Sequence, residues 1–292
     1  MEALNNLGNS YQHQGRYELA IDTFREALAA YEWSQLHHNL GAAFLAAGSI
    51  DSALAHFQSA FDLTPADRET TEGLARALIK AERLQSAQRL LVGALREAPD
   101  DEELLRLLAS AQMGMDSDHE ALATFRRSGL TAAEAHLRIA DAARERHIWR
   151  RAREHYEAGL ETAPEDARLL DGLGTVLVAE GEWRSALVLF RRAAEQDPAL
   201  ATSFRNIGLV NLHHHRLSEA LAALERARDL DTDDGKTWEL LGRAYALGER
   251  RSEAIAAYDR AIELQPARAE LFHNLAVLHE ANGQMKEAER LY

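Results

Sequence analysis

Hydrophobic and small residues return along this chain with a period of about 34 residues. Each period holds an apolar residue followed by a small one, an alanine twelve positions after that small residue, and a large apolar side chain four positions after the alanine. Apolar residues inside these segments stand three and four apart, the spacing of a helix face. The alanines are Ala20, Ala53, Ala87, Ala121, Ala152, Ala186, Ala220, Ala254 and Ala288, at spacings of 33, 34, 34, 31, 34, 34, 34 and 34 residues.

This periodicity predicts pairs of helices that pack closely. Small residues at a helix crossing let the two axes approach, while neighbouring large side chains fill the holes beside the crossing. The apolar–small dipeptide occurs in all nine periods, from Leu7-Gly8 to Leu275-Ala276. A fixed period of this length is typical of a solenoid, in which each helix pair contacts only its neighbours.

The eighth period carries a family resemblance. It reads Trp238, Leu241-Gly242, Tyr245, Ala254, Tyr258, Ala261, Pro266 and resembles the tetratricopeptide repeat consensus. The resemblance implies an all-α fold, an α-solenoid that forms a right-handed superhelix of stacked antiparallel helix pairs. It covers the whole chain as one solenoid, residues 1–292, with repeats at about 1–33, 34–67, 68–101, 102–132, 133–166, 167–200, 201–234, 235–268 and an incomplete 269–292.

Proline and glycine mark the predicted turns. The five prolines, of which Pro65 is the first, each fall twelve residues after a repeat alanine, where they suit a turn between repeats and the first turn of the next helix. Gly15, Gly48, Gly181 and Gly283 fall in the turn inside a repeat, where a left-handed residue is needed. The fourth repeat is short, and Gly129 followed by a capping box of Thr131 and Glu134 predicts an early helix end and a local change in curvature.

Composition narrows the class of protein. The net charge of −14 and the lack of a basic run argue against a nucleic-acid partner. No apolar stretch reaches eighteen residues, so no membrane span is expected. Without cysteine there are no disulfides or thiolate sites. Because Met1 already occupies a helix position, we expect no signal peptide and a cytoplasmic protein. Thirty arginines against three lysines indicate a bacterial source.

The family resemblance also indicates where a partner binds. It implies that the second, fifth, ninth, twelfth and thirteenth residues of each repeat line a concave groove. Among these positions are the candidate peptide-binding residues Arg76, Arg205 and Arg243. The lining as a whole is mixed, neither uniformly basic nor uniformly apolar.

Some members of the family hold a peptide carboxylate in a clamp of cations and asparagines. In the first three repeats the matching asparagines, Asn5 and Asn9, are present together with Asn39, but the cations are absent, so this clamp is expected to fail. From the fourth repeat onward Arg106, Arg138 and Arg168 occupy the corresponding positions and could converge on a carboxylate or phosphate. The alternative is a solvated network in which these arginines pair with Glu103, Glu134 and Asp171.

Asparagines at the sixth repeat position form a second candidate set. Asn6, Asn39, Asn206 and Asn274 resemble the asparagine ladder of the O-linked N-acetylglucosamine transferase superhelix, where amides hold an extended peptide backbone. Only four of the nine repeats carry one. The alternative is that each asparagine bonds a neighbouring turn of its own helix.

Metal and catalytic signals are weak. The run His213-His214-His215 cannot face one ion from a helix, because successive residues diverge by about 100°, and it is interpreted as a polar turn. Asp229, Asp231 and Asp233 begin like a calcium loop but lack its glycine and closing glutamate, and are interpreted as an acidic turn. With no phosphate-binding loop or catalytic carboxylate pair, the sequence predicts no cofactor, no metal and no enzyme activity.

Three hypotheses for function remain open. The first is a non-catalytic scaffold that binds a segment of a partner protein in the groove. The second is the recognition region of a larger enzyme, such as a glycosyltransferase, with its catalytic domain beyond Tyr292. The third, compatible with either, is self-association through the unfinished C-terminal repeat.

Overall fold

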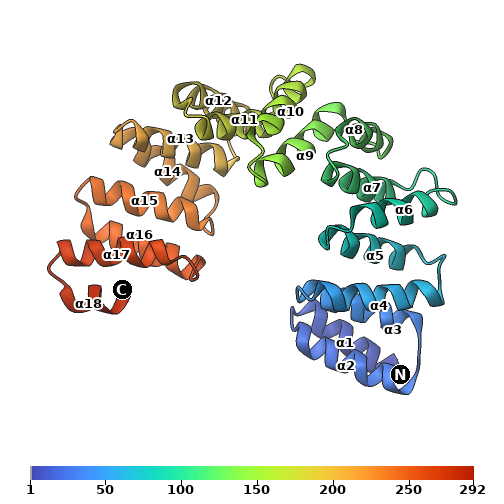
Figure 1. The fold of residues 1–292 in the computed structure, drawn as a ribbon. Helices are drawn as coiled ribbons and strands as arrows, with labels where there is room; N and C mark the ends of the chain where they lie inside the picture. Colours follow the sequence, from blue (N-terminus) through green and yellow to red (C-terminus); the bar gives the residue numbers. More distant parts are fainter. Residues whose placement is uncertain (1) are drawn as a thin grey trace. The chain divides into compact units, whose positions relative to one another are not determined.

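The computed structural model describes residues 2–292, which contain eighteen helices and no strand. Met1, expected to begin the first helix, lies outside the described residues. The chain forms two compact units, Met1–Ala135 and His136–Tyr292. In each unit successive helices pack as antiparallel pairs, and each pair stacks on the next (Figure 1). The all-α architecture of stacked helix pairs is therefore confirmed, while one continuous right-handed solenoid stays a prediction.

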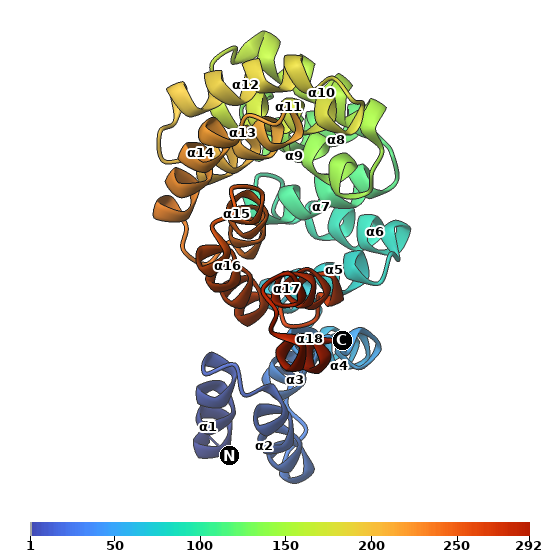
Figure 2. The same ribbon diagram turned by 90° about the vertical axis from the view of Figure 1, so that its left-hand side faces the viewer.

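The helices alternate between a first and a second helix of each repeat. The first unit contains α1 (Glu2–His13), α2 (Tyr17–Ala30), α3 (Ser34–Ala46), α4 (Ile50–Leu63), α5 (Arg68–Lys80), α6 (Leu84–Ala94), α7 (Glu102–Gly114), α8 (Asp118–Arg127) and the start of α9 (Ala132–Glu145). The second continues with α10 (Trp149–Thr162), α11 (Ala167–Ala179), α12 (Trp183–Gln196), α13 (Ala201–His213), α14 (Leu217–Leu230), α15 (Gly235–Leu247), α16 (Arg251–Leu264), α17 (Ala269–Ala281) and α18 (Met285–Leu291). Figure 2 shows the two helices of a pair side by side, for example α15 and α16.

Small residues lie where the helices of a pair cross, as the pattern predicts. The nine repeat alanines are at most 1% exposed. A Cβ added to Gly8 would lie 2.4 Å from the Phe24 ring, and one added to Gly174 would lie 2.6 Å from the Phe190 ring. The small residue of the dipeptide therefore makes room for the large side chain of the second helix.

The large side chains at this position of the second helices also reach the next repeat. A Cβ on Gly73 would lie 2.3 Å from the Phe57 ring, and one on Gly172 would lie 2.3 Å from Tyr156. Each ring is thus wedged between the first helices of two successive repeats. Further ties between repeats are hydrogen bonds from arginines on second helices to carbonyls of the preceding turn, as in Arg192 Nη2 to the Pro164 carbonyl at 3.1 Å.

The prolines lie in the turns between repeats, as predicted, but outside the first turn of the next helix. Pro65 lies three residues before α5, so it sits in the turn and not in the first turn of the helix. The helix is instead begun by Asp67, whose side chain accepts from the Thr70 amide at 2.9 Å. Asp101, Asp166 and Asp234 cap α7, α11 and α15 in the same way. A carboxylate at this place satisfies free amides and favours the positive end of the helix dipole, which proline cannot do.

A left-handed residue closes the turn inside each repeat. The predicted glycines have φ of 72° at Gly15, 81° at Gly48, 83° at Gly181 and 75° at Gly283. The other five repeats place a side chain in the same conformation, with φ of 57–59° at Glu82, Asp116, His147, His215 and Glu249. The turn geometry is therefore common to all nine repeats, and in five of them it is strained.

We expect Glu82→Gly to raise the free energy of unfolding by about 1 kcal/mol, because glycine adopts this conformation without a Cβ clash. Glu82 is exposed, and its amide still bonds the Ile79 carbonyl after the change. Urea denaturation measures the effect. Glu82→Ala removes the same charge but keeps the strain, so it serves as the matched control and should leave stability near that of the parent. Equal effects of glycine and alanine would contradict the explanation.

The fourth repeat ends early, as predicted. Its second helix, α8, has 10 residues, whereas α10 and α12 each have 14. Gly129 follows with φ 88°, and the Thr131 amide donates to Glu134 Oε2 at 2.8 Å while Thr131 Oγ1 accepts from the Glu134 amide at 3.2 Å. The capping box is thus confirmed, and the boundary of the two compact units falls just beyond it. Across residues 2–292, no helix combines the length and apolar character that crossing a bilayer requires.

Candidate functional site

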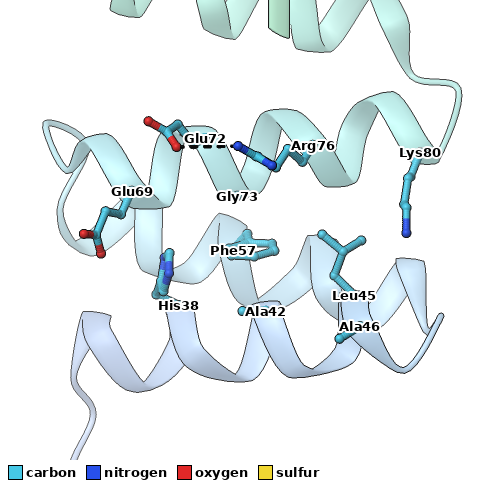
Figure 3. Close-up of a pocket in the computed structure, with 10 residues that line it drawn as sticks. All are labelled: His38, Ala42, Leu45, Ala46, Phe57, Glu69, Glu72, Gly73, Arg76 and Lys80. Atoms are coloured by element: carbon cyan, nitrogen blue, oxygen red, sulfur yellow. Dashed lines mark ion pairs between the residues drawn. The ribbon is translucent and has the colours of Figure 1, made fainter. Parts of the chain in front are cut away.

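The first unit contains a groove between the first helices of repeats two and three. Its cavity of about 430 Å³ lies between α3 and α5 (Figure 3). Phe57 of α4 lies between the two helices, with His38 and Glu69 at one end and Leu45 and Lys80 at the other. The lining residues are His38, Ala42, Leu45, Ala46, Phe57, Glu69, Glu72, Gly73, Arg76 and Lys80.

We call this cavity the first-unit groove. Its charged side chains are largely paired with one another. Arg76 forms ion pairs with Glu72 at 3.9 Å, drawn dashed in Figure 3, and with Glu103 of the next repeat. Glu72 also pairs with Arg68 at 2.8 Å. Burial raises the pKa of the Glu72 carboxyl, an effect that the Arg68 guanidinium opposes. Lys80 and Arg76 are both exposed, as is the Glu69 carboxylate, so the groove presents charges of both signs to solvent.

A larger groove lies in the second unit. Its cavity of about 550 Å³ is lined by the first helices of four consecutive repeats, α9, α11, α13 and α15, and by Arg268 just before α17. We call it the second-unit groove. Its lining residues are Leu137, Asp141, Arg144, Arg168, Asp171, Gly172, Thr175, Leu200, Thr202, Arg205, Asn206, Leu209, Lys236, Glu239, Leu240 and Arg268.

A half-buried carboxylate, Asp171, lies in the second-unit groove. Asp171 of α11 accepts hydrogen bonds from Ser203 Oγ at 2.9 Å and Asn206 Nδ2 at 3.2 Å, both on α13. Burial raises the pKa of the Asp171 carboxyl, and these two donors oppose the rise. The carboxylate therefore ties two successive first helices together at the groove surface.

Ion pairs and hydrogen bonds of arginine side chains lie around this carboxylate in the groove. Arg205 of α13 pairs with Asp234, the cap of α15, at 2.7 Å. Arg268 pairs with Glu239 of α15. Arg144 donates to Asp141 at 3.2 Å and to the Tyr156 hydroxyl at 2.9 Å. Each guanidinium has five N–H donors, and only some of them bond to these partners. The remaining N–H groups can donate to a carbonyl or carboxylate of a ligand.

The groove positions implied by the family resemblance account for most of both linings. Eight of the ten residues around the first-unit groove and eleven of the sixteen around the second occupy those positions. The candidates Arg76, Arg168, Arg205 and Asn206 are among the lining residues. Their part in peptide binding stays a prediction.

Other candidates lie apart from these cavities. On α1, Asn5 accepts from Asn39 Nδ2 of α3 at 2.7 Å, and Asn9 is half-buried. Arg243 is exposed on α15, and Asn274 is half-buried on α17. Asn39 thus bonds the preceding repeat, as Asn206 does through Asp171. Two of the four recurring asparagines, Asn39 and Asn206, therefore bond a side chain of the preceding repeat, a contact that the alternative of bonding within their own helix does not describe.

The three arginines of the predicted anion site are placed as follows. Arg106 belongs to the first unit, where it pairs with Glu102 at 2.9 Å and with Glu103 at 3.5 Å, the latter as in the solvated network. In the second unit, Arg138 is exposed on α9, and Arg168 pairs with Asp166 at 2.8 Å. Convergence of the three on one ligand stays a prediction.

Four lining residues of the second-unit groove and two of the first-unit groove were not among the predicted groove residues. Phe57 follows the core pattern of the repeat, yet one of its faces reaches the first-unit groove. Leu200 and Arg268 precede helices and so fall outside the helix positions of the rule. They could have been predicted by counting the turn residue immediately before each first helix among the groove positions.

The histidine and aspartate runs each begin in the last turn of a helix, with His213 in α13 and Asp229 in α14, and continue into the turn that follows. His213 ends α13 and stacks on Trp183 with ring centroids 3.8 Å apart, and His215 takes the left-handed turn position. Asp231 and Asp234 flank the turn between α14 and α15. Within the described chain, no three histidine, aspartate or glutamate side chains are grouped so that they could hold a metal ion.

Comparison with known proteins agrees with this architecture. Sequence models of the tetratricopeptide repeat match residues 1–66, 44–111, 137–201 and 172–235, and a model described as TPR repeat matches 242–283. Part of the Homo sapiens protein O-mannosyl-transferase TMTC1 is 25% identical over 198 residues, which are 65% of this chain and 22% of that protein. This chain therefore spans only a small part of the length of that relative.

A solved structure with a TM-score above 0.5 shows the same fold. The Cut9–Hcn1 structure of an APC/C hetero-tetramer aligns over 94% of this chain and 55% of its own, at 14% identity and a TM-score of 0.54. MamA of Desulfovibrio magneticus RS-1 aligns over 55% of this chain and 90% of its own, at 21% identity and a TM-score of 0.48. With its nine-fold pattern and its stacked helix pairs, the chain belongs to the tetratricopeptide repeat family.

Proposed function

We propose that this chain is a non-catalytic interaction scaffold that holds an extended segment of a partner protein in the second-unit groove. The observation that carries this proposal is a cavity of about 550 Å³ lined by four consecutive first helices. A surface spread over four repeats suits a chain segment, because each repeat adds contacts along one line.

The chemistry of the lining supports a peptide ligand. Leu137, Leu209 and Leu240 offer apolar contacts, while Thr175 and Thr202 offer hydroxyl groups. Arginine donors left over from the ion pairs suit main-chain carbonyls, which every peptide presents. The mixture favours an amphipathic segment over a nucleic acid, since the carboxylates of Asp141, Asp171 and Glu239 also line the cavity.

Filling the cavity tests the proposal. A peptide selected from a random phage library on the parent protein serves as the probe, and its affinity is measured by fluorescence anisotropy. We expect Thr175→Trp to weaken binding at least about tenfold, which corresponds to about 1.4 kcal/mol, because the indole occupies the space of the ligand.

Val188→Trp is the matched control. Val188 lies on α12, is 58% exposed and is not part of the cavity lining, so its replacement should leave affinity unchanged. Circular dichroism verifies that both variants fold. Failure to select any peptide, or equal affinity of the two variants, would overturn the proposal.

A second candidate is that the array recognises substrates for a larger enzyme. The similarity to part of human O-mannosyl-transferase TMTC1, a transferase by name, favours it. The reading frame of the gene beyond the codon of Tyr292 decides the matter, because a catalytic domain would show as sequence without the 34-residue period.

A further inference from the structure

Two pairs of histidines face each other at the same place in two repeats. His37 of α3 and His56 of α4 have their Nδ1 atoms 3.1 Å apart. Three repeats later, His136 of α9 and His155 of α10 have theirs 2.9 Å apart. In both cases the partners are 19 residues apart and join the first helix of a repeat to its second.

These positions are otherwise occupied by residues that do not titrate. The other seven repeats hold Leu4 with Thr23, Thr71 with Leu90, Leu105 with Thr124, Leu170 with Leu189, Phe204 with Ala223, Trp238 with Ala257 and Phe272 with Leu291. Histidine therefore enters this contact only as a pair, and it does so twice. If these histidines only filled space, one position of a pair could hold histidine without the other.

The geometry is that of a shared proton. One Nδ1 donates and the other accepts, so at least one ring must keep an unprotonated Nδ1. A first additional proton leaves this bond intact, because an imidazolium can still donate to its neutral partner. A second one places two N–H groups against each other and breaks the bond.

The surroundings of the first pair oppose that second proton. His37 is 8% exposed. The ring of His56 stacks on Phe44 with an interplanar angle of 5°, and the Arg25 guanidinium of α2 lies 5.3 Å from the Phe44 ring centroid. Burial lowers the pKa of His56, and the charges of His37 and Arg25 lower it further. Arg25 is itself 3.7 Å from Asp22, an exposed pair.

We propose that the two histidine pairs are pH-sensitive locks, which hold the helices of repeats two and five together at neutral pH and release them in mild acid. The unfolded chain takes up both protons near the ordinary histidine pKa of 6.5, whereas in the folded first pair burial lowers the pKa of His56, so that this ring is protonated only at lower pH. Stability is therefore full above pH 6.5 and falls as the pH drops below it.

Release has a consequence for the first-unit groove. Helix α3 carries His37 in the lock and His38, Ala42 and Leu45 in the groove lining. Loosening α3 from α4 therefore opens the wall of that groove. This consequence concerns the first-unit groove and is separate from the function proposed for the second-unit groove, and the lock itself is tested without any ligand.

Hydrogen exchange of the full chain, read by mass spectrometry and corrected for intrinsic rates, measures the local opening of residues 34–63. We expect protection there to fall about tenfold between pH 6.5 and pH 5, the effect of one proton bound on opening. In the double variant His37→Leu and His56→Leu, which copies the leucines of repeat six, most of this fall should vanish.

The control is His38→Gln. Burial also lowers the pKa of His38, which contacts Thr70 Oγ1 at 3.3 Å outside the lock, so this variant should keep most of the pH response. If His38→Gln abolishes the response and the leucine variant retains it, the lock is wrong. Should the leucine variant fold poorly, nitrogen-15 spectra of the parent decide. Two rings that both carry their proton on Nε2 at pH 7 and titrate together near 6.5 would exclude the shared proton.

Discussion

Replacing Phe57 with alanine is expected to lower the free energy of unfolding by about 3–5 kcal/mol, the range for removing a buried aromatic ring. The ring is 1% exposed. It lies between two glycines of successive first helices, since a Cβ on Gly41 would come within 2.8 Å of it and one on Gly73 within 2.3 Å. The substitution therefore removes one packing contact inside repeat two and another between repeats two and three.

Urea denaturation followed by far-UV circular dichroism measures this loss. Leu63→Ala on the same helix is the control, because Leu63 is 48% exposed and should change stability by only about 0.5 kcal/mol. Repeat arrays can unfold in parts, so hydrogen exchange over residues 34–80 shows whether the loss is local. A cost no larger than that of Leu63→Ala would mean that the ring does not join the repeats.

Sequence predicted the helix pairs because their packing rule is local. Each small residue and its large partner, such as Gly8 and Phe24, lie at a fixed spacing inside one repeat, so the period alone reveals them. Only those left-handed turns that contain glycine could be predicted from the sequence. Glycine marked Gly15 and Gly48, but Glu82 has a similar left-handed φ without any compositional sign, in a turn that is closed by the Arg83 amide donating to the Leu78 carbonyl at 2.9 Å.

The candidate site was less predictable for a different reason. The partner of a long arginine side chain depends on which carboxylates the neighbouring repeat brings within reach, as with Arg205 and Asp234, 29 residues apart. The role of Asp171 between Ser203 and Asn206 likewise spans two repeats. The resemblance to the family supplied the groove-facing positions, whereas these bonds required the coordinates.

Ala254→Leu is expected to lower the free energy of unfolding by about 3 kcal/mol, the upper end of the range for methylenes added to a packed core. Ala254 is 0% exposed and packs in the same cluster as Leu241, Tyr258 and Leu271. Leucine adds three carbons where α15 and α16 cross, so the helices must separate or the side chain must leave its preferred rotamer.

The same helix supplies a matched control for that change. Ala256 is exposed on α16, two residues from Ala254, and alanine and leucine have similar helix propensities. Ala256→Leu should therefore stay within about 0.5 kcal/mol of the parent in urea denaturation. Because both variants add the same side chain to one helix, the difference between their free energies of unfolding measures the effect of the helix crossing alone. Equal stability of the two would show that the recurring alanines are not required for close approach, and the physical basis of the 34-residue pattern would have to be sought elsewhere.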